Sequence, residues 1–126
     1  MSDKGKSVDV QAEQTPEALV IRLSGDAGVD QVDDLDRELR GLAALKPKRA
    51  ILDLSGVSVV ASMAMGALLR FRNAVAADGG VVELAGLTKN VGESFRVAGL
   101  GRVLPMHASV AAALAAKPAA TPPANR

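Results

Sequence analysis

The stretch Ala50-Ile51-Leu52-Asp53-Leu54 constrains the fold of this chain more than any other feature of its sequence. It is short, apolar at almost every position and closed by Ser55-Gly56. A continuous apolar run of this length is typical of a strand buried on both faces, whereas a strand with one face in water alternates apolar and polar residues. Strands of the first kind lie in the interior of a sheet, so the stretch predicts a central strand.

Two further strands are predicted before it. Residues 8–14 alternate loosely between apolar and polar side chains, which indicates a first strand at the edge of the sheet. Thr15-Pro16-Glu17 then predicts a turn, because proline fixes φ and cannot donate a hydrogen bond to a neighbouring strand. Residues 19–23 alternate more strictly and place three apolar side chains on one face, as expected for a strand that packs on a core.

Helices are predicted on either side of the central strand. The first begins at about Asp30 and ends at Pro47, with acidic residues early and basic residues late, as the helix dipole favours. The second begins near Ser62 and is stopped by Asp78-Gly79-Gly80. Apolar residues recur at three- and four-residue spacing in both, which gives each helix one face for the core. These residues are Val32, Leu35, Leu39 and Leu42 in the first helix, and Ala64, Leu68, Phe71 and Val75 in the second.

Shorter elements are predicted in the last part of the chain. Residues 81–84 form another strand, a short helix ends at Gly99, and residues 102–104 add a brief strand. Ser109 is a suitable cap for a final helix. Two strands followed by alternating helices and strands predict an α/β fold: a mixed sheet of four or five strands, with the helices mainly on one face.

The composition argues against several classes of function. The net charge is only +1, and Phe71 and Phe95 are the only aromatic residues, so neither a basic face for DNA nor a stacking platform for single strands is expected. The chain has no cysteine and a single histidine, His107, so we expect no metal site, no cofactor and no Ser-His-Asp set. We expect His107 itself at the surface or at a helix cap. These features favour a protein that binds a partner over an enzyme.

The two ends of the chain differ in composition from its middle. The first seven residues are polar and lack the apolar stretch of a signal peptide, and no apolar run approaches the length of a membrane span. Residues 117–126 contain three of the six prolines and no large apolar side chain. We therefore expect a flexible N-terminus over residues 1–7, one domain over residues 8–116, a disordered tail over residues 117–126, and a cytoplasmic location.

Five short stretches occur along the chain in a fixed order. Each stretch alone is a weak indication of a family, but their ordered combination is more specific. They are Val20-Ile21-Arg22-Leu23-Ser24-Gly25, Ile51-Leu52-Asp53-Leu54-Ser55-Gly56-Val57, residues 79–87, residues 95–104 and residues 109–114. Together they span most of residues 8–116 and resemble the STAS family, the domain of bacterial anti-sigma-factor antagonists. The resemblance implies a domain that binds another protein, commonly a serine kinase that doubles as an anti-sigma factor.

The resemblance also points to the head of the second helix as the regulated site. Family members carry Asp-Ser-Ser-Gly or a close variant there, and phosphorylation of a hydroxyl in this motif breaks the partner complex. The matching stretch here is Ala61-Ser62-Met63-Ala64, which leaves Ser62 as the candidate phosphoacceptor. An earlier loop that usually has Gly-x-Leu-Asp in the family has Gly25-Asp26-Ala27-Gly28 here.

The predicted partner-binding surface is the head of the second helix together with the loops around Gly25 and Gly56. It consists of Asp26, Ser58, Ala61, Ser62, Met63 and Met65. We expect Ser62 to cap the helix whether or not it is phosphorylated, and the free N–H groups of the helix end suit a phosphate. Met63 and Met65 fit either the core or a contact with the partner. Asp53 is better suited to accept hydrogen bonds that fix the turn after its strand than to act as a catalytic carboxylate.

Three functions are compatible with the sequence. The first is an anti-sigma-factor antagonist that binds a serine-kinase anti-sigma factor reversibly. The second is a permanent STAS subunit of a lipid-transport ABC complex or a signalling assembly, which the loss of the acidic residue and the glycine around Ser62 favours. The third, a small ligand-binding protein or enzyme, has the least support, because no convergent polar residues stand out. Neither nucleic-acid binding nor direct membrane insertion is expected.

Overall fold

The computed structural model describes residues 8–118. The expected flexible N-terminus, residues 1–7, and all of the expected tail beyond residue 118 lie outside the described residues.

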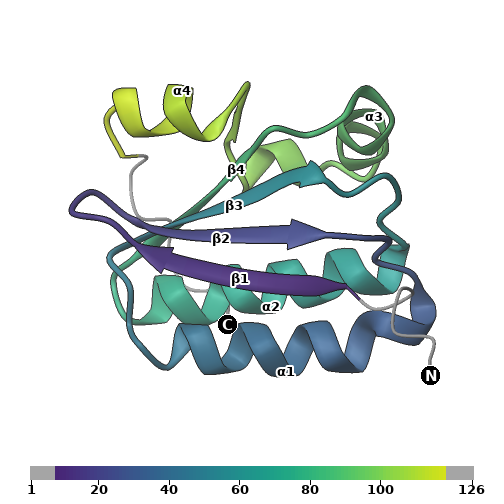
Figure 1. The fold of residues 1–126 in the computed structure, drawn as a ribbon, viewed down its shortest axis with the longest axis horizontal. Helices are drawn as coiled ribbons and strands as arrows, with labels where there is room; N and C mark the ends of the chain where they lie inside the picture. The colour runs from purple at the N-terminus through teal and green to yellow at the C-terminus, as the bar shows by residue number, and fades with distance from the viewer. Residues whose placement is uncertain (1–7, 119–126) are drawn as a thin grey trace.

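Five strands form one sheet in the order β1-β2-β3-β4-β5 (Figure 1). β1 is antiparallel to β2, and β2 to β5 are parallel to one another. The strands are β1 (Asp9–Gln14), β2 (Leu19–Ser24), β3 (Arg49–Gly56), β4 (Val81–Ala85) and β5 (Met106–His107). This arrangement confirms the predicted mixed sheet, the edge position of the first strand and the central position of β3.

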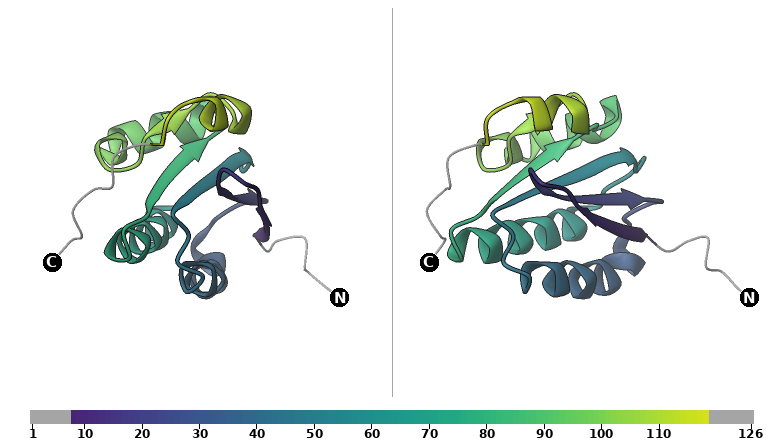
Figure 2. Two further views of the ribbon diagram at one scale, coloured as in Figure 1. Left: turned by 90° about the vertical axis from the view of Figure 1, so that its left-hand side faces the viewer. Right: turned by 60° about the vertical axis from the view of Figure 1, so that its left-hand side comes forward.

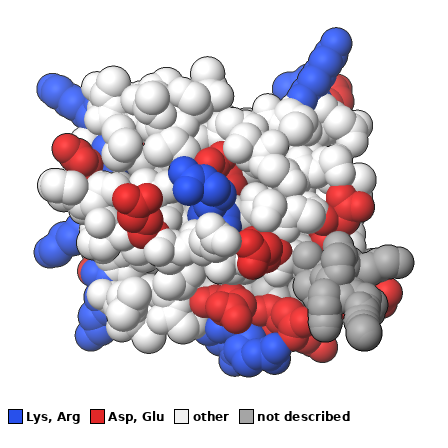
Figure 3. All heavy atoms as spheres, viewed as in Figure 1, with Lys and Arg blue, Asp and Glu red and all other residues white. Residues whose placement is uncertain are grey.

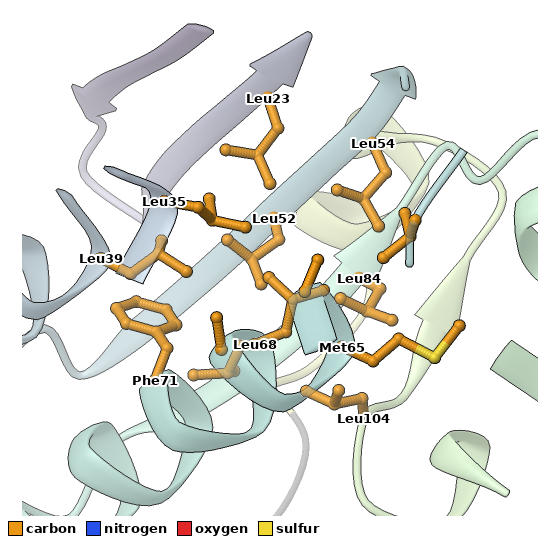
Figure 4. Packing of buried hydrophobic residues seen from close by; sticks show 14 of the residues in the cluster. Leu23, Leu35, Leu39, Leu52, Leu54, Met65, Leu68, Phe71, Leu84 and Leu104 are labelled. Carbon is orange, nitrogen blue, oxygen red and sulfur yellow. The ribbon is translucent and has the colours of Figure 1, made fainter. Parts of the chain in front are cut away.

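Two long helices cover one face of the sheet (Figures 1 and 2). They are α1 (Val32–Ala43), which follows the short helix η2 (Val29–Gln31), and α2 (Ser62–Ala77). Their apolar faces enter the main core with the residues of β2, β3 and β4 that point to the same side. Figure 4 shows the ring of Phe71, on α2, beside Leu39, on α1. The periodic apolar positions of both helices are therefore core positions, as predicted, except that Leu42 is only half-buried.

A smaller helix covers part of the opposite face of the sheet (Figure 2). This helix is α4 (Val110–Ala115), and its Ala113 packs in a second cluster with Ala18, Ile51 and Ala85. Ser109 caps α4 by accepting a hydrogen bond from the N–H of Ala112 at 3.0 Å, as predicted. Because helices lie on both sides, Arg49–Leu54 of β3 is buried without interruption.

The brief strand expected over residues 102–104 is wrong. Residues 100–102 form a short helix, η3 (Leu100–Arg102), and the last strand is β5, two residues further along. Leu104 has no exposed surface and belongs to the main core. Leu104 is apolar because it is buried in the connection before β5. A short buried connection and a short strand have the same apolar pattern, so the sequence could not distinguish them.

The expectation for His107 is also wrong, because this residue is half-buried in β5 and not at the surface or a cap. Its Nε2 lies 3.0 Å from Oε1 of Glu83, a residue of β4 with no exposed surface. Nη2 of Arg49 donates to the same oxygen at 2.8 Å and to the carbonyl oxygen of Ala113 at 2.6 Å. A buried ion pair therefore connects β3, β4 and β5 and holds α4 against the sheet.

Candidate protein-binding surface

The predicted surface lies at the end of the sheet where the parallel strands finish, on the right of Figure 1. The loops that follow β2 and β3 meet there, beside the head of α2. Ala27 and Val60 form an isolated parallel bridge between these loops, with hydrogen bonds from Ala27 N–H to the carbonyl oxygen of Val59 and from Ala61 N–H to that of Ala27, both 2.9 Å long. Backbone pairing therefore holds the two loops in one arrangement, which suits a surface that must match a partner.

Glycine is required where the two strands leave the sheet. A Cβ on Gly56 would lie 2.9 Å from Cβ of Ser24, closer than Cβ atoms approach in proteins, and 3.2 Å from the carbonyl oxygen of Leu23, a tight contact with backbone. Gly25 donates its N–H to the carbonyl oxygen of Gly56 at 3.0 Å. The glycines that end β2 and β3 in the sequence therefore let the two loops start side by side.

Asp26 and Ser58 come together on this surface although 32 residues separate them. The Ser58 hydroxyl donates to Oδ1 of Asp26 at 2.6 Å, and the Asn90 side chain donates to the carbonyl oxygen of Ser58 at 3.3 Å. Asn90 belongs to α3 (Lys89–Val97), which follows β4. Three segments that are distant in the sequence thus meet around Ser58.

Ser62 does not cap α2, so this prediction is wrong. The N-cap is Ala61, whose backbone is extended (φ −71°, ψ 157°), and no side chain of residues 8–118 caps the helix. The hydrogen bond from Ala61 N–H to Ala27 draws this residue into the loop pairing, and the helix starts at the next residue. A capping hydroxyl must sit on the extended residue to reach the first N–H groups, and Ser62 comes one residue too late. The N–H groups of Ser62, Met63 and Ala64 therefore have no acceptor within the helix and no cap.

The two methionines of the predicted surface have different environments. Met65 is 9% exposed and belongs to the main core (Figure 4), whereas Met63 is 59% exposed. Ser62 is exposed beside Met63, and Ala61 is half-buried. Of the two roles that the sequence left open, Met65 therefore takes the core and Met63 faces solvent.

An open groove of about 460 Å³ separates the head of α2 from α3. Val60, Ala61, Ser62 and Met65 line one side, and residues of α3, among them Val97, line the other. Val59 and Val97 are 47% and 77% exposed. Both valines and Asn90 were missed from the sequence alone. Asn90 and Val97 are far from Ser62 in the sequence, and no local pattern marks Val59 as a surface residue. Large apolar side chains at a groove are typical of protein–protein contacts.

Asp53 fixes the turn that leads from β3 into this surface, as expected. Its Oδ1 accepts a hydrogen bond from the N–H of Ser55 at 3.0 Å, and its Oδ2 accepts one from Nε of Arg22 at 3.1 Å. Gly86 passes close to this turn: it has φ 71°, and a Cβ there would lie 3.1 Å from Oδ1 of Asp53 and from Cβ of Ser55. Asp53 therefore organises the end of β3 and its neighbour β4.

The environment of Asp53 changes its acidity. Burial by itself would raise the pKa of this carboxyl, but hydrogen bonds from the backbone and side chain of Ser55, and then Arg22, outweigh it and hold the pKa below its ordinary value. A depressed pKa means that the ionised form stabilises the folded state above the unfolded pKa, about 4. This stabilisation is lost as the pH falls through the folded pKa.

Replacing Asp53 with Asn is expected to remove this pH dependence. At pH 7, Asp53→Asn should lower the free energy of unfolding by about 1–2 kcal/mol, because a charge-assisted acceptor is lost. At about pH 3 the difference from the wild type should shrink, because this pH lies below the unfolded pKa and the stabilisation by the ionised carboxyl is lost from there down to the folded pKa. Urea unfolding curves at the two pH values measure both quantities. An equal loss of stability at both would mean that the charge of Asp53 contributes nothing.

Two features are absent from the whole described range: a membrane-spanning helix and a group of metal-ion ligands. None of the helices within residues 8–118 is long and apolar enough to cross a membrane. In the same range, no three His, Asp or Glu side chains are grouped as ligands for a metal ion.

The fold and its sequence pattern match known proteins. The family model described as "STAS domain" matches residues 9–113. An anti-sigma factor antagonist from Mycobacterium paratuberculosis superimposes with a TM-score of 0.80 at 18% identity, covering 91% of this chain and 97% of that one.

Two other solved structures are similar at comparable identity. The Bacillus cell fate determinant SpoIIAA in its phosphorylated form gives a TM-score of 0.65 at 23% identity, covering 85% of this chain and 97% of that one. A sulfate transporter family protein from Wolinella succinogenes gives 0.66 at 20% identity, covering 76% and 80%. No curated protein sequence matches the chain. At these identities the solved structures establish the fold, and the family model, which spans most of the sequence, establishes that the chain belongs to the STAS domain family.

Proposed function

We propose that this chain is a regulatory, protein-binding STAS domain of the cytoplasm, which acts as an anti-sigma-factor antagonist by reversible binding to a serine-kinase anti-sigma factor. The observation that carries the proposal is the head of α2, where exposed Ser62 and Met63 stand on an uncapped helix end. The loops beside them are held by backbone pairing, so the surface is formed before a partner arrives.

The same site suits a switch by phosphorylation. The Ser62 hydroxyl is exposed, and the unpaired N–H groups of the first helical turn would stabilise a phosphate. A phosphate adds a charge of roughly −1.5 to −2 at pH 7, beside the apolar side chain of Met63. A partner that had covered Met63 would then have to bury this charge, which is costly without a compensating contact.

Met63→Asp is expected to weaken binding to the kinase-type anti-sigma factor of the same organism by about tenfold to a hundredfold. An apolar contact would be lost and a charge would have to be desolvated, which together cost on the order of 1.4–2.8 kcal/mol. Isothermal titration calorimetry with the purified partner measures the effect. Leu45→Asp is the matched control, because Leu45 is also a large exposed apolar residue (67%) but lies at the other end of the sheet, after α1. Equal affinity for Met63→Asp and the wild type would contradict the proposal.

Substitutions of Ser62 separate its role in binding from its role in the fold. Since Ser62 does not cap α2, Ser62→Ala should change the free energy of unfolding by less than about 0.5 kcal/mol and leave binding intact. Ser62→Asp adds a negative charge at a helix start, where it is favourable, so the fold should persist while partner affinity falls about tenfold. Thermal unfolding and calorimetry provide the two readouts. A loss of binding in Ser62→Ala as large as that in Ser62→Asp would argue against a charge-controlled switch.

A second function is favoured by one specific observation. Ala61 and Ala64 replace the acidic residue and the glycine of the family motif, and the exposed side chains of Val59, Met63 and Val97 make the region apolar. Such a surface also suits permanent contact, as in a subunit of a lipid-transport ABC complex or a signalling assembly. Mass spectrometry of the protein from its native cell distinguishes the two: phosphate on Ser62 supports the switch, whereas a stable complex without phosphate in any growth condition supports the permanent subunit.

A further inference from the structure

A second hollow lies on the far side of α3 from the head of α2. It has a volume of about 600 Å³, and its lining includes Arg96, Val97, Gly99, Gly101, Arg102 and Met106. Val97 borders both this hollow and the groove beside α2, so the two form one continuous surface. We call the second one the α3–η3 hollow.

Apart from its two arginines, the α3–η3 hollow is lined by apolar side chains and glycines. Met106 is 38% exposed, and its methyl carbon would lie 3.8 Å from a Cβ on Gly101. Gly99 and Gly101 have no side chains, so an incoming side chain can approach the backbone there. Val97 and Met106 are two of the five large apolar residues that the described part of the chain exposes most. The hollow can therefore receive apolar side chains of a partner.

The rim of the hollow is basic. Arg96 pairs with Glu93 one turn earlier in α3, whereas Arg102 forms no ion pair within residues 8–118. Glu93 is the only acidic residue of α3 and η3, and it pairs with Arg96 and not with Arg102. An acidic group of a partner would gain an ion pair with Arg102 without displacing an internal one.

Acidic residues predominate in the first part of the described chain and basic residues in the second. Residues 8–40 contain nine acidic and three basic side chains, whereas residues 41–118 contain four acidic and nine basic ones. Most of the first set belongs to β1, β2 and α1, and Figure 3 shows several acidic side chains over α1, in the lower part of the view. Within the second set, α3 and η3 contain three basic side chains, Lys89, Arg96 and Arg102, and one acidic side chain, Glu93. This local excess of basic side chains favours a partner that is acidic where it meets α3 and η3.

We propose that the partner protein places an acidic segment with apolar side chains in the α3–η3 hollow, as a second contact beside the head of α2. The proposal rests on the proposed function, because it assigns more of the same surface to the same partner. Apolar side chains of the segment cover Val97 and Met106, and a carboxylate pairs with Arg102. The second contact adds affinity and selects partners by charge.

An anionic membrane fits this surface less well than a peptide segment. Val97, at 77%, is the only apolar side chain of the lining that is largely exposed, and a single such side chain inserts little apolar surface into a lipid layer. Attraction to an anionic membrane contributes about 1 kcal/mol per basic residue, and only Arg102 at the rim lacks an internal ion pair. A single arginine is better matched to a single carboxylate than to a charged plane.

The test uses the isotope-labelled chain and two synthetic amphipathic peptides, one composed of Glu and Leu and the other with Lys in place of Glu. The Glu/Leu peptide should shift the NMR signals of Val97, Gly99, Gly101 and Met106, and the Lys/Leu peptide should bind at least tenfold more weakly. Arg102→Glu should weaken binding of the Glu/Leu peptide about tenfold, because reversal removes an attraction and adds a repulsion. Lys48→Glu, the same charge change at the other end of the sheet, should alter it by less than about twofold.

Three results would overturn the inference: equal binding of the two peptides, equal effects of Arg102→Glu and Lys48→Glu, or binding to phosphatidylserine vesicles with no shift caused by the Glu/Leu peptide. Met63→Asp lies outside the hollow and should leave peptide binding unchanged. If Met63→Asp fails to affect the kinase-type partner while the peptide still binds the hollow, the proposed function fails and the hollow stands. If Met63→Asp weakens binding of the kinase-type partner but the two peptides bind equally well, the proposed function stands and the α3–η3 hollow fails as a second contact.

Discussion

Glu83→Leu is expected to lower the free energy of unfolding by about 3–5 kcal/mol, because it leaves the charge of Arg49 buried without its carboxylate. Arg49 is 5% exposed and Glu83 is fully buried, and Nη2 and Oε1 are 2.8 Å apart. Nε of Arg49 has no hydrogen-bond partner within residues 8–118, and the contact that Nη2 keeps, with the carbonyl oxygen of Ala113, supplies no negative charge. A loss of this size is a large part of the stability of a small domain.

The double variant Arg49→Met, Glu83→Leu keeps the prediction testable if the single variant does not fold. Replacing both partners of a buried ion pair by apolar side chains of similar volume is often neutral or stabilising, so the double variant should recover most of the loss. Arg37→Met is the control: its pair with Asp34 is exposed and should contribute less than about 1 kcal/mol. Urea unfolding of all three gives the values. A double variant as unstable as Glu83→Leu would show that apolar packing cannot replace the ion pair here.

Phe71→Ala is expected to cost about 3–5 kcal/mol, since it removes the largest side chain from the interface between α1 and α2. Phe71 is 3% exposed and lies against Leu39 (Figure 4). Its edge also borders a surface groove between the two helices. The space left by the ring can therefore partly collapse or admit water, which places the expected cost toward the lower end of this range.

Two comparisons check the prediction for Phe71. Phe71→Leu keeps most of the apolar volume and should cost less than about 1.5 kcal/mol. Leu45→Ala truncates a residue that is 67% exposed and should fall within about 0.5 kcal/mol of the wild type. Chemical denaturation, analysed with one common dependence of the free energy of unfolding on denaturant concentration, gives the change in stability of each of the three variants. A cost below about 1 kcal/mol for Phe71→Ala would mean that this face of α2 is not packed as described.

The candidate surface was predicted in outline and corrected in detail. The stretch that resembles the family motif placed Ser62 and Met63 at the head of α2, and both are exposed there. The local pattern could not show that Ala61 becomes the N-cap, because this follows from its hydrogen bond to Ala27, 34 positions earlier in the chain. The contact of Asp26 with Ser58 depends on the same pairing of two loops.

Except for residues 100–107, the sequence by itself determined which segments become the main strands and helices and which of their faces are buried. The continuous apolar run of β3 and the periodic positions of α2 require only that apolar side chains leave water, and this requirement is written into each segment locally. The same holds for the caps of the short helices: Ser109 accepts from an N–H three residues away.

Only the tertiary structure decided which polar residues meet. Arg49 and Glu83 are 34 residues apart, and His107 lies 24 residues beyond Glu83, so nothing in any one segment shows that a charged residue within an apolar strand has a partner. The register of β3 against β4 and of β4 against β5 brings them together. In the same way, the α3–η3 hollow exists only because η3 and β5 fold back beside α3. Burial of apolar surface is a property of each segment, but the pairing of charges and the shape of a surface depend on which segments become neighbours.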